Sequence, residues 1–184
     1  NLVAAIDAGP DADRRTREII STALFPAAPS GSTPNSLALS PDGGILLVAN
    51  ADNHNIAVIN VSQPGHARSM GFIPTGWYPT SVRFRDADNV LYASGKGLSP
   101  KSNRHGPNPE QRRPGGIREY IADLFVGTLG FVRPFRPEIL ARLTADAYEC
   151  SPLRADSGVS GKPALGDNPI PSAVRAPVTY YPIA

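Results

Sequence analysis

A repeated segment constrains the fold of this 184-residue chain more than any other feature. Residues 33–50 align without gaps on residues 78–95, and the prolines Pro34 and Pro79 stand 45 positions apart (79 − 34 = 45). In both copies a proline precedes a short alternating stretch, a polar turn follows, and an apolar stretch completes the unit. A period of about 40–45 residues built from four short strands is typical of the blades of a β-propeller.

The first copy predicts its strands individually. Leu37 and Leu39 alternate with small or polar residues, which suits a half-buried strand. The turn Asp42-Gly43-Gly44 supplies residues that adopt the positive φ angles of a tight hairpin. The apolar run Ile45–Ala49 suits a strand covered on both faces. The remaining parts of the repeat are predicted as a polar turn at 52–55, an outer strand at 56–61 and a fourth strand near 68–73.

Partial copies flank the two repeats. Residues 1–7 resemble residues 55–60 and predict an outermost strand, and residues 120–132 resemble the last two strands of a third blade. We therefore expect an all-β fold, a partial β-propeller over residues 1–134 with four-stranded antiparallel blades in two full and two partial repeats. Blades bury their apolar faces only against other blades, and a closed ring needs at least about four of them. We expect the remainder of the same polypeptide, or companion chains, to complete the ring.

The pattern changes after the propeller repeats. Residues 135–150 predict a short helix, because Pro137 suits the first helical position and apolar residues recur on one face. Prolines and glycines recur through residues 151–184, which we interpret as an extended linker to a C-terminal domain missing from this sequence. The residues on the apolar face of the helix are Ile139, Leu140, Leu143 and Ala147.

Composition narrows the classes of function. The net charge of +2 is too small to indicate binding to nucleic acid, and no run of about 18 apolar residues predicts a membrane span. The single cysteine, Cys150, excludes an internal disulfide and a cysteine-based zinc cluster, and we expect a partly buried structural thiol there. The excess of positive charge is local, because residues 101–118 hold five basic side chains and one acidic one.

The repeat resembles a known family. Residues 33–43, 47–50 and 55–59 closely resemble the YVTN-type propeller repeat, which also occurs in lactonase-like propellers. Further segments are similar to one bacterial group, in which a secreted YVTN propeller is fused to a C-terminal phosphoesterase domain of the alkaline-phosphatase superfamily. These segments are Gly76–Thr80, Ser94–Leu98, Asn103–Pro109, Gly127–Leu129, Leu140–Thr144 and Asn168–Pro171.

The resemblance implies a periplasmic or secreted protein that hydrolyses phosphate esters with a divalent metal held in the missing domain. Its metal-binding and nucleophilic residues would follow Ile183, so we assign no catalytic residue and no cofactor to this chain. Two alternatives stay open. One is a non-enzymatic propeller that serves as a binding or scaffold module, and the other is a lactonase-like hydrolase with its own metal in a central channel.

Basic residues form the first group of candidate ligand-binding side chains. They would attract a phosphate ester by long-range charge and form a lip for a neighbouring active site. The alternative is a solvated surface loop. The members of this group are Lys96, Lys101, Arg104 and His105.

Two further groups flank the predicted strands. Trp77 and Tyr78 stand in a connection between blades, where aromatic rings either pack one blade on the next or contact a ligand. Asn50, Asp52 and Asn53 offer oxygen ligands for a divalent cation. The alternative for these three residues is that they satisfy backbone donors of their own turn.

Overall fold

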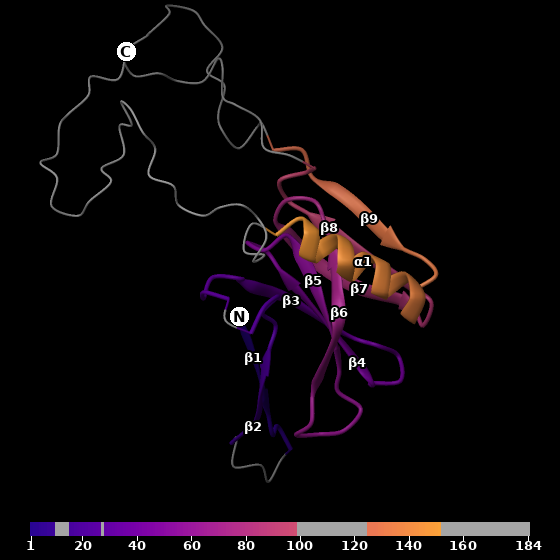
Figure 1. Cartoon of the computed structure of the whole chain (residues 1–184). Coiled ribbons are helices and arrows are strands. Elements are labelled where there is room, and N and C mark those ends of the chain that lie inside the picture. The colour runs from indigo at the N-terminus through magenta and orange to yellow at the C-terminus, as the bar shows by residue number, and fades with distance from the viewer. Residues whose placement is uncertain (10–14, 27, 99–124, 152–184) are drawn as a thin grey trace, which may run out of the picture. The chain divides into compact units, whose positions relative to one another are not determined.

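The described residues form antiparallel β-sheets and one short helix, so the all-β expectation is confirmed (Figure 1). The computed structural model describes residues 1–9, 15–26, 28–98 and 125–151. The chain divides into two units, Asn1–Cys150 and Ser151–Ala184, and the elements below all belong to the first. They are β1 Leu2–Ile6, β2 Thr16–Ser21, β3 Pro34–Leu39, β4 Ile45–Asn50, β5 Asn55–Asn60, β6 Arg68–Pro74, β7 Pro79–Asp86, β8 Asn89–Ser94, β9 Thr128–Val132 and α1 Pro137–Glu149.

The described strands form three sheets, each made of strands that follow one another in the chain. The first sheet pairs β1 with β2, the second has the order β3-β4-β5-β6, and the third has the order β7-β8-β9. All neighbouring strands are antiparallel. Each sheet is therefore a meander, in which every connection joins adjacent strands.

The second sheet forms where the sequence predicts it. Its apolar strand β4 is buried along nearly its whole length, as expected for a strand covered on both faces. The hairpin before β4 turns at Gly43, whose φ of 74° is accessible to glycine at little cost. The carboxylate of Asp42 supports this turn, because it accepts hydrogen bonds from the Ser40 hydroxyl (2.5 Å) and the Gly44 N–H (3.0 Å).

Two expected positions of strands are corrected by the pairing. The strand at 56–61 was expected at the outer edge, but β5 pairs with β4 on one side and β6 on the other. The outer edge of the second sheet is therefore β6. The expected outermost strand at residues 1–7 is β1, and its partner β2 was not predicted from the sequence.

The third sheet corrects the expected repeat count. β9 pairs with β8 in a continuous register, from Val90 opposite Val132 to Ser94 opposite Thr128. The prediction that these residues belong to a further blade is wrong, because β9 completes the sheet that β7 and β8 begin. In place of two full and two partial repeats, the described residues hold sheets of two, four and three strands. Residues 120–124, the rest of the predicted third blade, lie outside the described residues.

The hairpin of the third sheet is shorter than that of the second. Leu39 and Leu46 are paired across the β3–β4 hairpin, whereas Phe84 and Val90, one residue closer in sequence, are paired across the β7–β8 hairpin. The last residue of β4, Asn50, therefore corresponds to the last residue of β8. The gapless alignment of the two copies is wrong from this turn onward.

The first sheet repeats the outer half of the second. Leu2 pairs with Ser21 as Asn55 pairs with Pro74, and both members are shifted by 53 positions (55 − 2 = 53 and 74 − 21 = 53). In both strand pairs the register shifts after the fourth residue of the inner strand. The pair β1–β2 therefore corresponds to the pair β5–β6.

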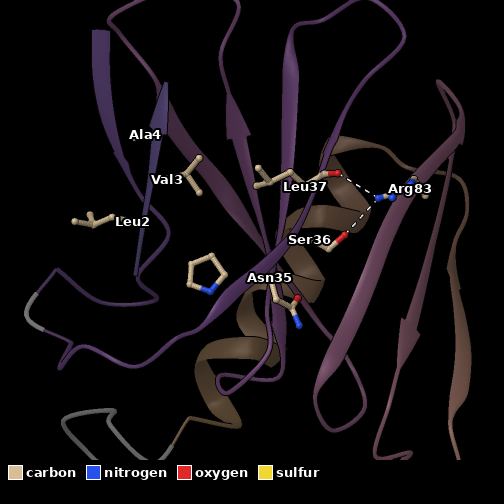
Figure 2. A pocket seen from close by; sticks show the side chains of 8 residues that line it. Leu2, Val3, Ala4, Asn35, Ser36, Leu37 and Arg83 are labelled. Atoms are coloured by element: carbon tan, nitrogen blue, oxygen red, sulfur yellow. Dashed lines mark hydrogen bonds between the residues drawn. The ribbon is translucent and has the colours of Figure 1, made fainter. Parts of the chain in front are cut away.

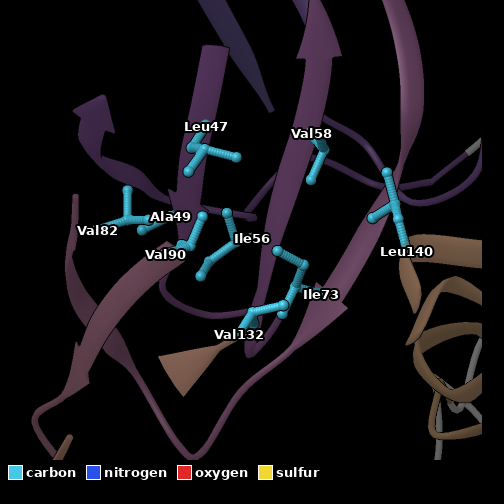
Figure 3. Packing of buried hydrophobic residues seen from close by; sticks show 9 residues of the cluster. All are labelled: Leu47, Ala49, Ile56, Val58, Ile73, Val82, Val90, Val132 and Leu140. Carbon is cyan, nitrogen blue, oxygen red and sulfur yellow. The ribbon is translucent and has the colours of Figure 1, made fainter. Parts of the chain in front are cut away.

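The second and third sheets pack face to face. Alternate residues of a strand point to opposite faces, so one set of side chains from β4 and β5 can serve one interface. Figure 3 shows this cluster, in which the second sheet meets residues of β7, β8 and β9. Its buried members are Leu47, Ala49, Ile56, Val58, Ile73, Val82, Val90, Val132 and Leu140.

The opposite face of the second sheet packs toward the first sheet. The intervening residues of β4 and β5 belong to a separate cluster with Ile20 of β2 and with Leu24. The second sheet is therefore covered on both of its faces. Its residues in this cluster are Leu46, Val48, Ala57, Ile59 and Phe72.

The first strands of the second and third sheets are in direct contact. The Val82 N–H donates to the Ser36 hydroxyl oxygen (3.2 Å), and the Arg83 guanidinium donates to the Leu37 carbonyl oxygen (3.2 Å). Strands β3 and β7 thus lie side by side although they belong to different sheets. This contact fixes one end of the face-to-face packing.

Helix α1 covers the outer edge of the second sheet. The Thr144 hydroxyl accepts the backbone N–H of Phe72 (2.9 Å), so the edge strand β6 does not leave that donor unpaired. Leu140 and Ala147 are buried, and each joins one of the two apolar clusters. The predicted helix is therefore present, but Cys150 at its end is exposed rather than partly buried. In the described part of the chain, no helix has the length and apolar character needed to cross a membrane.

A first prediction concerns Gly130 in β9. A Cβ atom there would lie 2.1 Å from Cζ of Tyr92, whose ring crosses the strand at this position. We expect Gly130→Ala to lower the free energy of unfolding by about 1–3 kcal/mol, as other overpacking substitutions do. Gly44→Ala is the matched control, because a Cβ there meets only ordinary contacts. Urea denaturation of both variants measures the difference, and equal stabilities would contradict the close approach.

A second prediction concerns acid stability. Hydrogen bonds from Ser40 and from Asn89 lower the pKa of Asp42 and of Asp86, respectively, below the ordinary value. The ionised carboxylates stabilise the fold above the unfolded-state pKa of about 4, and this contribution is lost as the pH falls through the lower folded-state pKa. We expect the melting temperature to drop as the pH falls below about 5. The double variant Asp42→Asn, Asp86→Asn should drop less, and an equal drop would refute this account.

Candidate functional site

Several of the sequence-predicted site residues gather where strands β4, β6 and β8 end. The turn between β4 and β5 carries His54, which has a positive φ of 53°, a conformation that is uncommon outside glycine. Its carbonyl oxygen accepts the backbone N–H of Thr75, just after β6 (2.9 Å). This turn is therefore tied to the connection that leads into β7.

The ring of His54 makes two further contacts with that connection. It stacks on Trp77 with ring centroids 4.7 Å apart, and its Nδ1 lies 3.2 Å from the backbone nitrogen of Tyr78. Nδ1 also lies 3.1 Å from the Ala51 carbonyl oxygen, but a ring nitrogen either donates or accepts. The backbone N–H of Tyr78 can only donate a hydrogen bond, so Nδ1 is the acceptor in that contact. The proton of the neutral ring then resides on Nε2.

Backbone hydrogen bonds join the same connection to the end of β8. The Trp77 N–H donates to the Gly97 carbonyl (2.6 Å), and the Lys96 N–H donates to the Trp77 carbonyl (3.1 Å). A Cβ atom at Gly76 would lie 2.5 Å from the Gly97 carbonyl oxygen, so this approach requires glycine. The two segments are therefore joined directly through their backbones.

Lys96 places a positive charge on these joined segments. Its Nζ lies 4.2 Å from the ring centroid of Tyr78, within the range of a cation–π interaction. Tyr78 has a φ of 60°, a second strained backbone position beside that of His54. Trp77 remains 39% exposed although one of its contacts is the His54 ring. The structure thus brings together Trp77, Tyr78 and Lys96 from the predicted set, and it adds His54.

His54 is a residue of this cluster that the sequence did not predict as a site residue. His54 was recognised only as a turn residue, because it has no metal-ligand spacing to another histidine. Lys101, Arg104 and His105, the other basic candidates, lie outside the described residues.

The three candidate cation ligands, Asn50, Asp52 and Asn53, form hydrogen bonds with different residues. Asn50 is fully buried, and its Nδ2 donates to the Thr22 carbonyl (2.9 Å) and to Asn55 Oδ1 (3.0 Å). The Asp52 carboxylate accepts a hydrogen bond from the Thr33 hydroxyl, and Asn53 Nδ2 donates one to the Ser32 hydroxyl oxygen (2.7 Å). Among the described residues, no group of three or more His, Cys, Asp or Glu side chains is placed to hold a metal ion.

Three buried side-chain oxygen atoms near this end have no hydrogen-bond partner in the described structure: Thr22 Oγ1, Asn50 Oδ1 and Ser94 Oγ. Asn50 and Ser94 stand at the corresponding last positions of β4 and β8. An unpaired buried acceptor or hydroxyl is costly unless water or another group reaches it. The strand ends are therefore the polar part of an otherwise apolar core.

A separate hollow of about 540 Å³ lies between β1 and β3. Figure 2 shows Leu2, Val3 and Leu37 around it, with Arg83 hydrogen-bonded to Ser36 and Leu37 at its side. Its wall mixes apolar and polar side chains, and the guanidinium of Arg83 that borders it already has hydrogen-bond partners. The hollow does not include the aromatic and basic cluster described above.

No protein-family model matches this chain, and no curated protein matches it. A solved structure of hydrazine synthase from Kuenenia stuttgartiensis is similar with 18% sequence identity and a TM-score of 0.36. The match covers 45% of this chain and 20% of that chain, so it spans about a fifth of the length of the hydrazine synthase chain.

A third prediction tests the role of His54. His54→Ala removes the acceptor of the Tyr78 N–H and the stacking partner of Trp77, and we expect a loss of about 1–3 kcal/mol in the free energy of unfolding. His54→Phe keeps an aromatic ring but not the acceptor, so it should lose less. His66→Ala, in an exposed turn, is the control. Denaturant titration measures all three, and equal stabilities of the two alanine variants would remove His54 from the site.

Proposed function

We propose that this chain is a section of a β-propeller that binds a phosphate ester at its strand ends and positions it for a metal-dependent phosphoesterase domain elsewhere in the protein. In this proposal the chain binds and orients, and the hydrolytic chemistry belongs to the other domain. The observation that carries the proposal is the cluster of Trp77, Tyr78 and Lys96, in which the ammonium lies 4.2 Å from the half-buried ring of Tyr78 and the neighbouring ring of Trp77 is exposed.

The arrangement of the sheets supports the propeller part of the proposal. Propeller blades are meanders of four strands that pack face to face around a central axis. Here a four-stranded meander packs between two others, in the order in which they occur along the chain. The first strands β3 and β7 are in contact through Ser36, as expected of the strands nearest the axis. The connections at the strand ends then open onto one surface of the ring.

The chemistry of the cluster supports a phosphate ester as ligand. A lysine ammonium attracts the anionic phosphate, and an aromatic ring packs against the apolar part of an ester. The ring of Tyr78 and the backbone of Gly97 fix the segment that carries Lys96. Little conformational entropy would therefore be lost when a ligand binds there.

The phosphoesterase part of the proposal rests on the sequence resemblance. Two of the segments that resemble the propeller–phosphoesterase group, Gly76–Thr80 and Ser94–Leu98, are the two that the hydrogen bonds of Trp77 join. A periplasmic or secreted location belongs to the same proposal. A non-enzymatic binding module would use the same surface, and it differs in having no catalytic domain to receive the ligand.

A fourth prediction tests ligand binding. Trp77 is the one tryptophan of the sequence, so its fluorescence reports directly on the cluster. We expect titration with phenyl phosphate to change this fluorescence in a saturable way and to weaken as salt is added, because exposed charges are screened. Phenol is the control for the ring alone. The chain should release no phenol from the ester, since hydrolysis is assigned to another domain.

Variants make this test specific. Lys96→Ala should weaken binding by about tenfold or more, which corresponds to the loss of one charge-assisted contact. Arg68→Ala is the matched control, because Arg68 is an exposed cation at the opposite end of the second sheet. The proposal fails if phenyl phosphate gives no saturable change or if both variants bind alike. Release of phenol by the chain alone would favour a hydrolase with its own site.

A further inference from the structure

We propose that a second copy of this chain packs on this one head to tail, with the outer face of the third sheet of one copy on the outer face of the first sheet of the other. The apolar residues on the outer face of the third sheet are Leu91, Ala93, Leu129 and Phe131, beside Ser81 and Arg83 of β7. The apolar residues on the outer face of the first sheet are Leu2, Ala4, Ile6 and Ile19. This inference rests on the repeated packing of the proposed propeller and not on its ligand.

The outer face of the third sheet corresponds to a face that is covered in the second sheet. β9 begins opposite the last residue of β8 just as β5 begins opposite the last residue of β4. Phe131 therefore occupies the position of Val58, and Leu129 that of Ile56. Val58 is 0% exposed because the third sheet covers it, whereas Phe131 is 53% exposed.

The outer face of the first sheet corresponds to the opposite face of the second sheet. The shared pairing of β1–β2 and β5–β6 places Ile6 at the position of Ile59, and Ile19 at that of Phe72. Ile59 is 1% exposed because the first sheet covers it, whereas Ile6 is 58% exposed. The first and third sheets thus expose apolar side chains at positions where the second sheet buries them.

The two exposed faces are the two halves of an interface that the molecule already contains. Between the second and third sheets, the face with Val58 meets the face with Val132. Val132 stands at the same strand position as Ile59, and hence as Ile6. The face with Phe131 is therefore built to receive the face with Ile6, by continuation of the existing packing. A second copy supplies that face.

The association has a defined geometry. Each contact joins two different faces, so it is heterologous and leaves one further face free on each copy. Such contacts close into a ring when the rotation between copies allows it. Two copies would bring together six sheets, within the range of about four to eight blades in propellers.

Sedimentation velocity over a range of protein concentrations tests the proposal with the full chain. We expect a species heavier than the 19.4 kDa chain that grows with concentration. Ile6→Asp and Phe131→Asp each place a charge on one face, and each alone should raise the dissociation constant by more than about tenfold. An equimolar mixture of these two variants should regain a dimer, because each variant keeps the face that the other has lost.

The control and the alternatives follow from the same measurement. Met70→Asp changes an exposed apolar residue of β6 that lies on neither face and should associate as the original chain does. Circular dichroism of each variant verifies that the strands are retained. A monomeric original chain overturns the proposal. A single variant that still dimerises also overturns it, because the contact then joins two like faces. A mixture that stays monomeric overturns it as well, because the two unlike faces then do not pair. The phosphate-ester titration is read separately, so either proposal can fail without the other.

Discussion

The burial of apolar side chains between neighbouring sheets is the interaction on which the rest of this structure depends. A β-strand projects residues to two faces, and β4 and β5 are apolar on both. Leu47 and Val58 face the third sheet, while Leu46 and Ile59 belong to the cluster on the other side. Water would solvate neither set favourably, so the second sheet is stable only between two others. The stacking order of the sheets follows from this requirement.

The stacking also builds the polar cluster at the strand ends. When two sheets pack face to face, the connection between them must cross the end of the first sheet before it enters the second. That connection carries Trp77 and Tyr78, and His54 in the adjacent turn holds it through its ring and its carbonyl oxygen. The end of β8 then approaches from the third sheet and brings Lys96. The site is therefore a consequence of the packing of three sheets and not of any one loop.

Local sequence signals predicted most of the second sheet and the helix. Glycine and aspartate at the β3–β4 turn, the apolar run of β4, and Pro137 before an amphipathic stretch each have a short-range physical cause. The errors came from long-range pairing. β9 was assigned to a further blade because the long connection 95–127 separates it from β8. β2 was missed because Thr16–Ser21 mixes charged and apolar residues and reads as a strand only beside β1.

The sequence by itself determined the repeating unit, the all-β character and the presence of aromatic and basic residues between the repeats, because these depend on residue type and on spacing along the chain. It did not show which of these residues lie close together in space. Only the tertiary structure decided that His54 joins Trp77 and Tyr78, that the candidates Asp52 and Asn53 are engaged by Thr33 and Ser32, and which apolar faces stay exposed. The reason is that hydrogen bonds and burial join residues that are distant in sequence, and their partners are set by the packing of whole sheets.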